Sequence, residues 1–140
     1  MQHCLPFSHE IERRVPFYDL DPLQIVWHGN YFNYFEDARQ ALLAQLGCDL
    51  TGYLTGNRYS FPIAKTETKH LHPLRYADAF ICKATLVEAR TRLVMDFEIR
   101  LKESGKRCAI GRTEQVAIKL PEMEILIFLP EEIRQALNCE

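Results

Sequence analysis

The segment from Tyr18 to Tyr31 contains the residues of this chain whose types and spacing could do chemistry. Asp19 and Asp21 are two carboxylates that stand two residues apart, directly before Pro22 and a predicted helix start. Helix N-termini carry unpaired N–H groups and partial positive charge, so they can hold a carbonyl oxygen. A nearby carboxylate could then attack the carbonyl carbon or activate a water. The pattern permits acyl-group hydrolysis without a serine triad, but by spacing alone it is more typical of ordinary turn and cap residues.

The cysteines and histidines give no metal-site pattern. The five cysteines include no pair at C-x-x-C spacing, which excludes a zinc ribbon and predicts free, mostly buried thiols in a reducing compartment. His70 and His72 would share one face of a strand, but no H-E-x-x-H motif or acidic cluster accompanies them. We therefore expect no metal, and a structural or surface role for this histidine pair.

Length and composition predict one globular domain over residues 1–140. The hydrophobic fraction of 47% and charged fraction of 26% are ordinary for a soluble domain. A net charge of −2 lacks the basic excess of nucleic-acid-binding proteins, so no nucleic-acid partner is expected. The longest apolar run, at residues 125–129, is far shorter than the about 20 residues that span a bilayer. With no signal peptide evident, we expect a cytoplasmic protein without an integral membrane segment.

One strong helix must position the acids, and it is predicted over residues 31–46 with Asn30 as its N-cap. Its apolar residues recur at spacings of three and four, at Tyr31, Tyr34, Phe35, Ala38, Leu42 and Leu46. Further apolar residues widen this face, so we expect the helix to be wrapped on more than one side. Gly47 suits the left-handed position that ends a helix.

Strands are predicted on both sides of this helix. The pattern favours extended structure at residues 9–17, 59–71, 79–87, 93–101, 107–120 and, more briefly, 124–129. Residues 48–57 read as a loop, Gly105 marks a hairpin, and Pro130 opens a C-terminal helical turn. The order predicts an α+β fold, in which one buried helix packs against one curved antiparallel sheet.

Two N-terminal blocks resemble the signature of hotdog-fold acyl-CoA thioesterases. They read DLDP at residues 19–22, continued by IVWHGNY at 25–31, and FEDAR at 35–39. The most similar branch is the 4-hydroxybenzoyl-CoA thioesterase-like family, which includes the Tol-Pal-associated thioesterases. Weaker matches follow in order at HPLRYAD, GRT and LPEEI, so the resemblance covers nearly the whole chain.

The resemblance implies a thioesterase that hydrolyses an acyl-CoA or acyl-carrier-protein thioester. It places the catalytic carboxylate on Asp21, as general base or nucleophile, and the carbonyl-polarising backbone N–H at His28. The His28 side chain matches the histidine of the Tol-Pal-associated branch. Its neighbours at the helix start are expected to bind substrate, namely Trp27, Gly29, Asn30 and Tyr31. Coenzyme A would be part of the substrate, so no cofactor is implied.

Two further residue pairs have a role only through the resemblance. Arg90 and Arg92 sit at a predicted strand turn, where related thioesterases contact coenzyme A phosphates, and arginine suits phosphate because its planar fork donates bidentately. Leu23 and Gln24 stand where many relatives carry glycine or another small residue. We expect this pair to narrow or reshape the acyl pocket.

The resemblance also implies that two chains pair into a continuous sheet with active sites at the interface. A half-wrapped helix and an exposed edge strand at residues 107–120 would leave surface to be covered. We therefore predict a homodimer or a homotetramer built as a dimer of dimers.

Two other functions remain open on the same fold. A hydroxyacyl-thioester dehydratase or hydratase would need an acid on the helix, and Glu36 would have to serve. Glu36 also stands three residues before Arg39, which predicts a structural ion pair. A non-catalytic acyl-binding module is the other alternative, since fold alone does not decide function.

Overall fold

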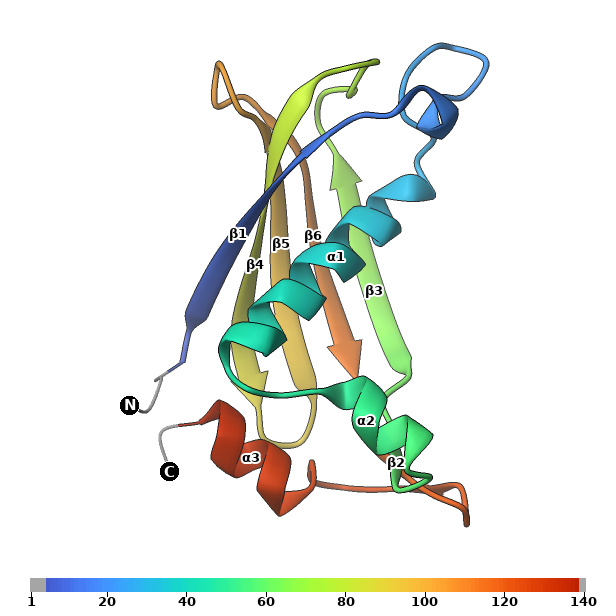
Figure 1. The fold of residues 1–140 in the computed structure, drawn as a ribbon, viewed down its shortest axis with the longest axis vertical. Helices are drawn as coiled ribbons and strands as arrows, with labels where there is room; N and C mark the ends of the chain where they lie inside the picture. The colour runs from blue at the N-terminus through green and yellow to red at the C-terminus, as the bar shows by residue number, and fades with distance from the viewer. Residues whose placement is uncertain (1–4, 139–140) are drawn as a thin grey trace.

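The computed structural model describes residues 5–138 and shows a curved antiparallel sheet around one long helix (Figure 1). The strands of this sheet are β1 (Phe7–Arg14), β3 (Ile63–His70), β4 (Ala79–Ala89), β5 (Leu93–Leu101) and β6 (Arg107–Gln115). The long helix is α1 (Asn30–Gln45). The shorter elements are η1 (Phe17–Asp19), α2 (Leu50–Thr55), β2 (Tyr59–Ser60), β7 (Ile118–Lys119), β8 (Glu124–Ile125) and α3 (Glu131–Leu137). The predicted α+β class, with a helix wrapped by an antiparallel sheet, is confirmed.

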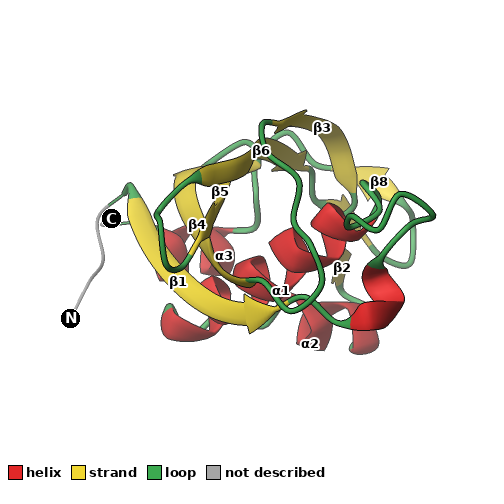
Figure 2. Cartoon of the chain, turned by 90° about the horizontal axis from the view of Figure 1, so that it is seen from above, coloured by secondary structure: helices red, strands yellow, loops and turns green. Residues whose placement is uncertain are grey.

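The apolar stripe predicted for the helix forms the buried face of α1. Its buried residues are Tyr31, Tyr34, Phe35, Ala38, Arg39, Leu42 and Leu43. Phe35 stacks on Phe97 of β5 with ring centroids 4.7 Å apart, and Tyr34 packs on Phe80 of β4 at 4.8 Å. Burying one such side chain contributes about 1.5–3 kcal/mol, so these contacts set where α1 lies. Seen from above, the strands curve around the helix (Figure 2).

The strand order corrects one prediction. The sheet runs β1-β4-β5-β6-β3, so β6 lies inside it and the edges are β1 and β3. The prediction of an edge strand at residues 107–120 is therefore wrong. The strand β3, which lies much earlier in the chain, pairs with the side of β6 that β5 leaves open. The strand also ends at Gln115, and β7 joins a second, small sheet of order β2-β7-β8.

Two local predictions also differ from the structure. The predicted loop at residues 48–57 contains the helix α2, whose Leu50 and Tyr53 pack against the core. Packing of two apolar residues on one side explains a helix that is too short to be stable by itself. The N-cap of α1 is Gly29, and Asn30 is the first helical residue. Gly47 adopts φ +70° just past the helix end, as predicted.

The edge strand β3 is the least covered part of the sheet. All of its residues except Thr68 are exposed, and α1 lies closest to β1 and β4. Within residues 5–138, β3 pairs with β6 alone, so its other edge has no neighbour in the chain. Over the same residues, no helix is long and apolar enough to cross a membrane.

Candidate active site

The turn that contains Asp21 is closed by its own backbone. The Leu23 N–H donates to Asp21 Oδ1 at 2.8 Å, and the Gln24 N–H donates to the Asp21 carbonyl at 2.9 Å. The Asp21 N–H donates to the Ile25 carbonyl at 2.8 Å. One carboxylate oxygen is thus held by the turn, while Asp21 Oδ2 has no hydrogen-bond partner in the described part of the chain. The carboxylate is oriented and keeps one oxygen free for chemistry.

Gln24 and Leu23 complete this turn, Gln24 with a positive φ and Leu23 with an exposed side chain. Gln24 adopts φ +62°, a left-handed conformation that glycine takes at lower cost. The Leu23 side chain is 76% exposed. Neither residue lines the pocket described below, and an effect of this pair on the acyl pocket stays a prediction. The hydrogen bonds that the Leu23 and Gln24 N–H groups donate to Asp21 hold the backbone in this conformation.

The turn leads into the start of α1 through a short extended segment. The Val26 N–H donates to the Leu74 carbonyl at 2.9 Å, and the Trp27 N–H donates to the Asp19 carbonyl at 3.0 Å. Asn30 Nδ2 also donates to the Asp19 carbonyl, at 2.9 Å. The Asn30 side chain therefore ties the helix start to the acidic turn, instead of capping the helix as predicted.

Two backbone N–H groups at the helix start are free. The Asn30 N–H donates to the Trp27 carbonyl at 2.9 Å, and the Tyr31 N–H donates to the His28 carbonyl at 3.3 Å. The N–H groups of His28 and Gly29 have no acceptor among residues 5–138. They precede a helix of 16 residues, whose dipole favours negative charge at this end. These donors could hold the oxygen of a polarised carbonyl.

A pocket of about 330 Å³ brings the acid and the helix start together. Asp21, His28 and Tyr31 line it, as do His70 at the end of β3 and His72 after it. The rings of Tyr31 and His70 meet edge to face with centroids 4.7 Å apart. Burial, and then the neighbouring His28, lower the pKa of His70, which favours a neutral imidazole near pH 7. The pocket thus combines a carboxylate and three imidazoles, and it lies at the helix start that carries the free N–H donors.

The sequence did not reveal that His70 and His72 belong to this site. Their spacing indicated only a shared strand face, and no local motif links them to Asp21. They reach the pocket because β3 ends beside the first turn of α1, a contact between segments far apart in the chain. The N–H groups of Leu71 and His72 both donate to the Cys108 carbonyl, which fixes this end of β3.

The Trp27 side chain lies against Gly29, the N-cap residue of α1. A Cβ atom added to Gly29 would lie 2.3 Å from the Trp27 ring, a distance at which one of them must move. The indole is 52% exposed and its centroid lies 5.2 Å from that of His28. Glycine at residue 29 thus permits the indole to lie across the backbone that carries the free N–H groups.

The two arginines predicted to bind coenzyme A lie far from Asp21 in one chain. Arg90 and Arg92 stand at the β4–β5 hairpin, at the opposite end of the sheet from η1 and the acidic turn (Figure 1). The eleven residues of β4 separate the two ends, and a strand of that length spans about 35 Å. Arg92 pairs with Glu114 at 3.2 Å. A single chain does not bring these arginines to the pocket.

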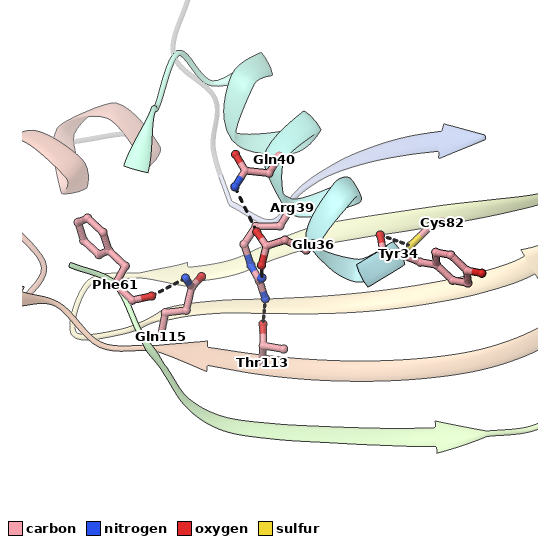
Figure 3. A network of polar contacts seen from close by, with 8 residues as sticks. All are labelled: Tyr34, Glu36, Arg39, Gln40, Phe61, Cys82, Thr113 and Gln115. Carbon is pink, nitrogen blue, oxygen red and sulfur yellow. Dashed lines mark hydrogen bonds and ion pairs between the residues drawn. The ribbon is translucent and has the colours of Figure 1, made fainter. Parts of the chain in front are cut away.

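Glu36 belongs to a separate polar network on α1, in which Arg39 is the buried member (Figure 3). It forms an ion pair with Arg39, which is 2% exposed and also donates to Thr113 Oγ1 at 2.6 Å. Gln40 Nε2 donates to the other Glu36 oxygen at 3.2 Å. Burial lowers the pKa of Arg39, and the charge of Glu36 opposes that shift. The predicted structural pairing of Glu36 with Arg39 is confirmed, and Glu36 does not line the pocket.

Thiol and metal chemistry find no support elsewhere in the described chain. Cys48, Cys82 and Cys108 are free and buried, as predicted. Burial raises the pKa of Cys48 to about 11 and that of Cys82 to about 12, so these thiols stay protonated. Cys4 and Cys139 lie outside the described residues. Between residues 5 and 138, no cluster of three or more histidine, cysteine, aspartate or glutamate side chains is arranged to hold a metal.

A larger hollow, of about 660 Å³, lies on the sheet face turned away from α1. Two of the charged residues that line it, Arg112 and Asp96, pair with each other through hydrogen bonds of 2.6 Å and 3.0 Å. It has neither the acidic turn nor a helix start beside it. The smaller pocket at Asp21 is therefore the candidate active site.

The contact between Trp27 and Gly29 leads to a prediction about the helix start. Gly29→Ala should displace the indole, and acrylamide should then quench its fluorescence more strongly. Trp27 is the single tryptophan of the chain, so the signal is unambiguous. Gly52→Ala, in the distant helix α2, is the matched control, because a Cβ atom added there meets only the Asp49 side chain, at 3.0 Å or more. Equal quenching in wild type and Gly29→Ala would contradict the packing described here.

Comparisons with known proteins identify the family of this chain. A family model for the thioesterase-like superfamily matches residues 15–137. The 1,4-dihydroxy-2-naphthoyl-CoA hydrolase of Thermosynechococcus vestitus is 27% identical over 118 residues, which are 82% of this chain and 79% of that protein. The structure of a 1,4-dihydroxy-2-naphthoyl-CoA thioesterase from Synechocystis has a TM-score of 0.83 at 22% identity, covering 94% of this chain and 96% of the other.

A second solved structure is a 4-hydroxybenzoyl-CoA thioesterase variant in complex with 4-hydroxybenzoyl-CoA. Its TM-score is 0.81 at 17% identity, and the match covers 94% of this chain and 99% of the other. This likeness shows a shared fold. With the family match over most of its length, the chain belongs to the thioesterase-like superfamily and is a hotdog-fold thioester hydrolase.

Proposed function

We propose that this enzyme hydrolyses an acyl-CoA thioester, with Asp21 as its catalytic carboxylate. The observation that carries the proposal is the pocket shared by Asp21 and the helix start, where the N–H groups of His28 and Gly29 are free. A carboxylate with one unpaired oxygen beside two such donors is the arrangement that acyl transfer requires. The similar proteins named above act on acyl-CoA thioesters, which supports the same substrate type here.

In the reaction, the thioester oxygen accepts hydrogen bonds from the His28 and Gly29 N–H groups. These bonds strengthen as negative charge develops on the oxygen, which lowers the barrier to attack at the carbonyl carbon. Asp21 Oδ2 either removes a proton from the attacking water or attacks the carbon itself to form a mixed anhydride, which water then hydrolyses. In both routes the C–S bond breaks, and the coenzyme A thiolate leaves and takes up a proton.

The substrate we propose is an aromatic acyl-CoA. The similar proteins have names that specify dihydroxynaphthoyl and hydroxybenzoyl groups. The edge-to-face rings of Tyr31 and His70 line one part of a pocket of about 330 Å³, where an aromatic acyl group could pack against them. Rates measured across aromatic, short-chain and long-chain acyl-CoAs would test this choice. Trp27, Asn30 and Tyr31 are the further substrate-binding residues of the proposal.

The helix start does not favour the dehydratase alternative. That reaction needs an acid on the helix to face the substrate with a histidine, but Arg39 and Gln40 occupy both Glu36 oxygens. A non-catalytic binding module would not require an oriented carboxylate with a free oxygen. The free Asp21 Oδ2 therefore supports hydrolysis over both rivals.

We also propose that the enzyme is a homodimer, alone or as half of a homotetramer, joined through β3. This strand is exposed on both faces and unpaired along one edge within residues 5–138. A two-fold axis at that edge would pair two copies of β3 antiparallel, and the sheet would become continuous. It would also carry the Arg90 and Arg92 end of one copy toward the Asp21 end of the other. Coenzyme A would then lie across the interface.

The remaining parts of the proposal concern location and partners. We place the enzyme in the cytoplasm, where reduced thiols such as Cys48, Cys82 and Cys108 persist. Its net charge of −2 gives no electrostatic reason for nucleic-acid binding. Coenzyme A is substrate and leaving group in this scheme.

The role of Asp21 can be tested directly. Asp21→Asn keeps the shape and the Leu23 hydrogen bond but removes the charge, so kcat should fall at least about a hundredfold without unfolding. Asp37→Asn, an exposed acid on the same helix as the active-site donors, is the matched control. Glu36→Gln should be milder. If Glu36→Gln abolishes turnover and Asp21→Asn leaves it within a few-fold, the catalytic acid is misassigned.

The assembly gives a second prediction. Light scattering at micromolar concentration should report a mass of at least twice the 16.4 kDa of one chain. A dimer is expected because β3 leaves a row of unpaired backbone groups that a second copy can satisfy. A stable monomer would disprove the interfacial site.

The arginines give a third prediction. Replacing Arg90 and Arg92 with Ala should raise KM for the acyl-CoA and leave kcat largely intact, because phosphate contacts bind substrate and transition state alike. The double variant Lys102→Ala and Lys106→Ala, at the hairpin of the other sheet end, controls for lost surface charge. An unchanged KM in the arginine variant would move the nucleotide site elsewhere.

A further inference from the structure

Asp19 is the most heavily bonded residue of the acidic turn. Its carboxylate oxygen Oδ2 accepts a hydrogen bond of 2.6 Å from the Tyr34 hydroxyl. Its carbonyl accepts one bond from the Trp27 N–H at 3.0 Å and another from Asn30 Nδ2 at 2.9 Å. Three donors from the helix and its entry segment thus converge on Asp19. The bond from Tyr34 is not needed to form the turn itself.

Tyr34 is a rigid donor. It is 6% exposed, and its ring packs on Phe80 at 4.8 Å and on Tyr31 at 6.0 Å. Its carbonyl accepts a weak bond from the Cys82 thiol at 3.7 Å, so backbone and side chain are both held by β4 (Figure 3). Burial, followed by the Asp19 carboxylate, raises the Tyr34 pKa, so the hydroxyl stays protonated and donates.

The bond between Tyr34 and Asp19 connects two parts of the proposed site. Asp19 stands two residues before Asp21, and the chain between them is extended, with Leu20 bridged to Val26. Tyr34 lies on α1, one turn after the segment that carries the free N–H groups. A short O–H···O⁻ bond is among the stronger hydrogen bonds in proteins. It joins the acidic turn to α1 independently of the hydrogen bonds that Asp21 makes with Leu23 and Ile25.

We propose that Tyr34 and Asp19 are positioning residues, which hold the Asp21 carboxylate in register with the N–H groups of His28 and Gly29. The inference rests on the proposed role of Asp21. Neither residue needs to touch the substrate for this role, and neither lines the pocket. A misplacement of about 1 Å can cost about a hundredfold in rate. The pair therefore affects the chemical step and leaves substrate binding nearly unchanged.

Tyr34→Phe is the main test, because it removes one hydroxyl and keeps the buried ring. It should lower kcat about tenfold or more, with KM for the acyl-CoA within about twofold of wild type. Tyr53→Phe is the matched control, since within residues 5–138 the Tyr53 hydroxyl has a single partner, Glu132 at 3.5 Å, at the far end of the molecule. Its kcat should equal that of wild type. An unchanged kcat in Tyr34→Phe would overturn the inference.

A double-mutant cycle separates positioning from a general loss of structure. In the Asp21→Asn background, Tyr34→Phe should cost little further activity, because the group that it positions is already disabled. An equal loss in both backgrounds would show that Tyr34 does not act through Asp21 and would overturn the inference. If Asp21→Asn alone retains activity, the proposed function fails instead.

Asp19 supplies an independent pair of variants, in case Tyr34→Phe is unstable. Asp19→Asn keeps an acceptor for the Tyr34 hydroxyl and should retain kcat within a few-fold. Asp19→Ala removes that acceptor and should match the kcat loss of Tyr34→Phe. Similar kcat values for the two Asp19 variants would contradict a positioning role for the hydrogen bond.

Discussion

The packing of α1 against the inner face of the sheet is the constraint on which the rest of the structure depends. Phe35 on Phe97 and Tyr34 on Phe80 set the height and rotation of the helix over β4 and β5. The first turn of α1 then falls at one end of the sheet. The free N–H groups and the positive end of the helix dipole therefore lie at that end of the sheet. The entry segment lies there too, because it leads directly into α1.

The candidate site is built where the acidic turn, the helix start that follows it and the distant end of β3 meet. The acidic turn supplies Asp21, the helix start supplies the His28 and Gly29 donors, and the end of β3 supplies His70. Each segment is held by backbone hydrogen bonds to a neighbour, as Val26 is to Leu74. Acyl transfer needs hydrogen-bond donors in fixed positions, because they stabilise negative charge that develops on the carbonyl oxygen only in the transition state.

The same packing leaves a strand for assembly. With α1 over β1 and β4, the edge strand β3 is exposed on both faces and borders the pocket through His70. A partner on that edge would cover β3 and complete the site with groups from the far end of the sheet, where Arg90 and Arg92 lie. In the proposed dimer, the interface along β3 would therefore border the candidate active site.

The sequence by itself determined the main elements of the fold and indicated a candidate acid. Period-two patterning located β5 at Leu93–Leu101, and the stripe from Tyr31 to Leu46 located α1, because both signals come from neighbours in the chain. The DLDP motif indicated Asp21 by resemblance. The edge prediction for residues 107–120 failed because strand order depends on pairing across the fold.

Only the tertiary structure decided which groups surround that acid. His70 reaches the pocket because β3 ends at the helix start, Tyr34 reaches Asp19 across the first turns of α1, and Glu36 is withdrawn into its bond with Arg39. Each of these contacts joins side chains whose meeting depends on helix rotation or on strand position in the sheet. Spacing along the chain cannot encode such meetings, because they are set by the packing of the whole core.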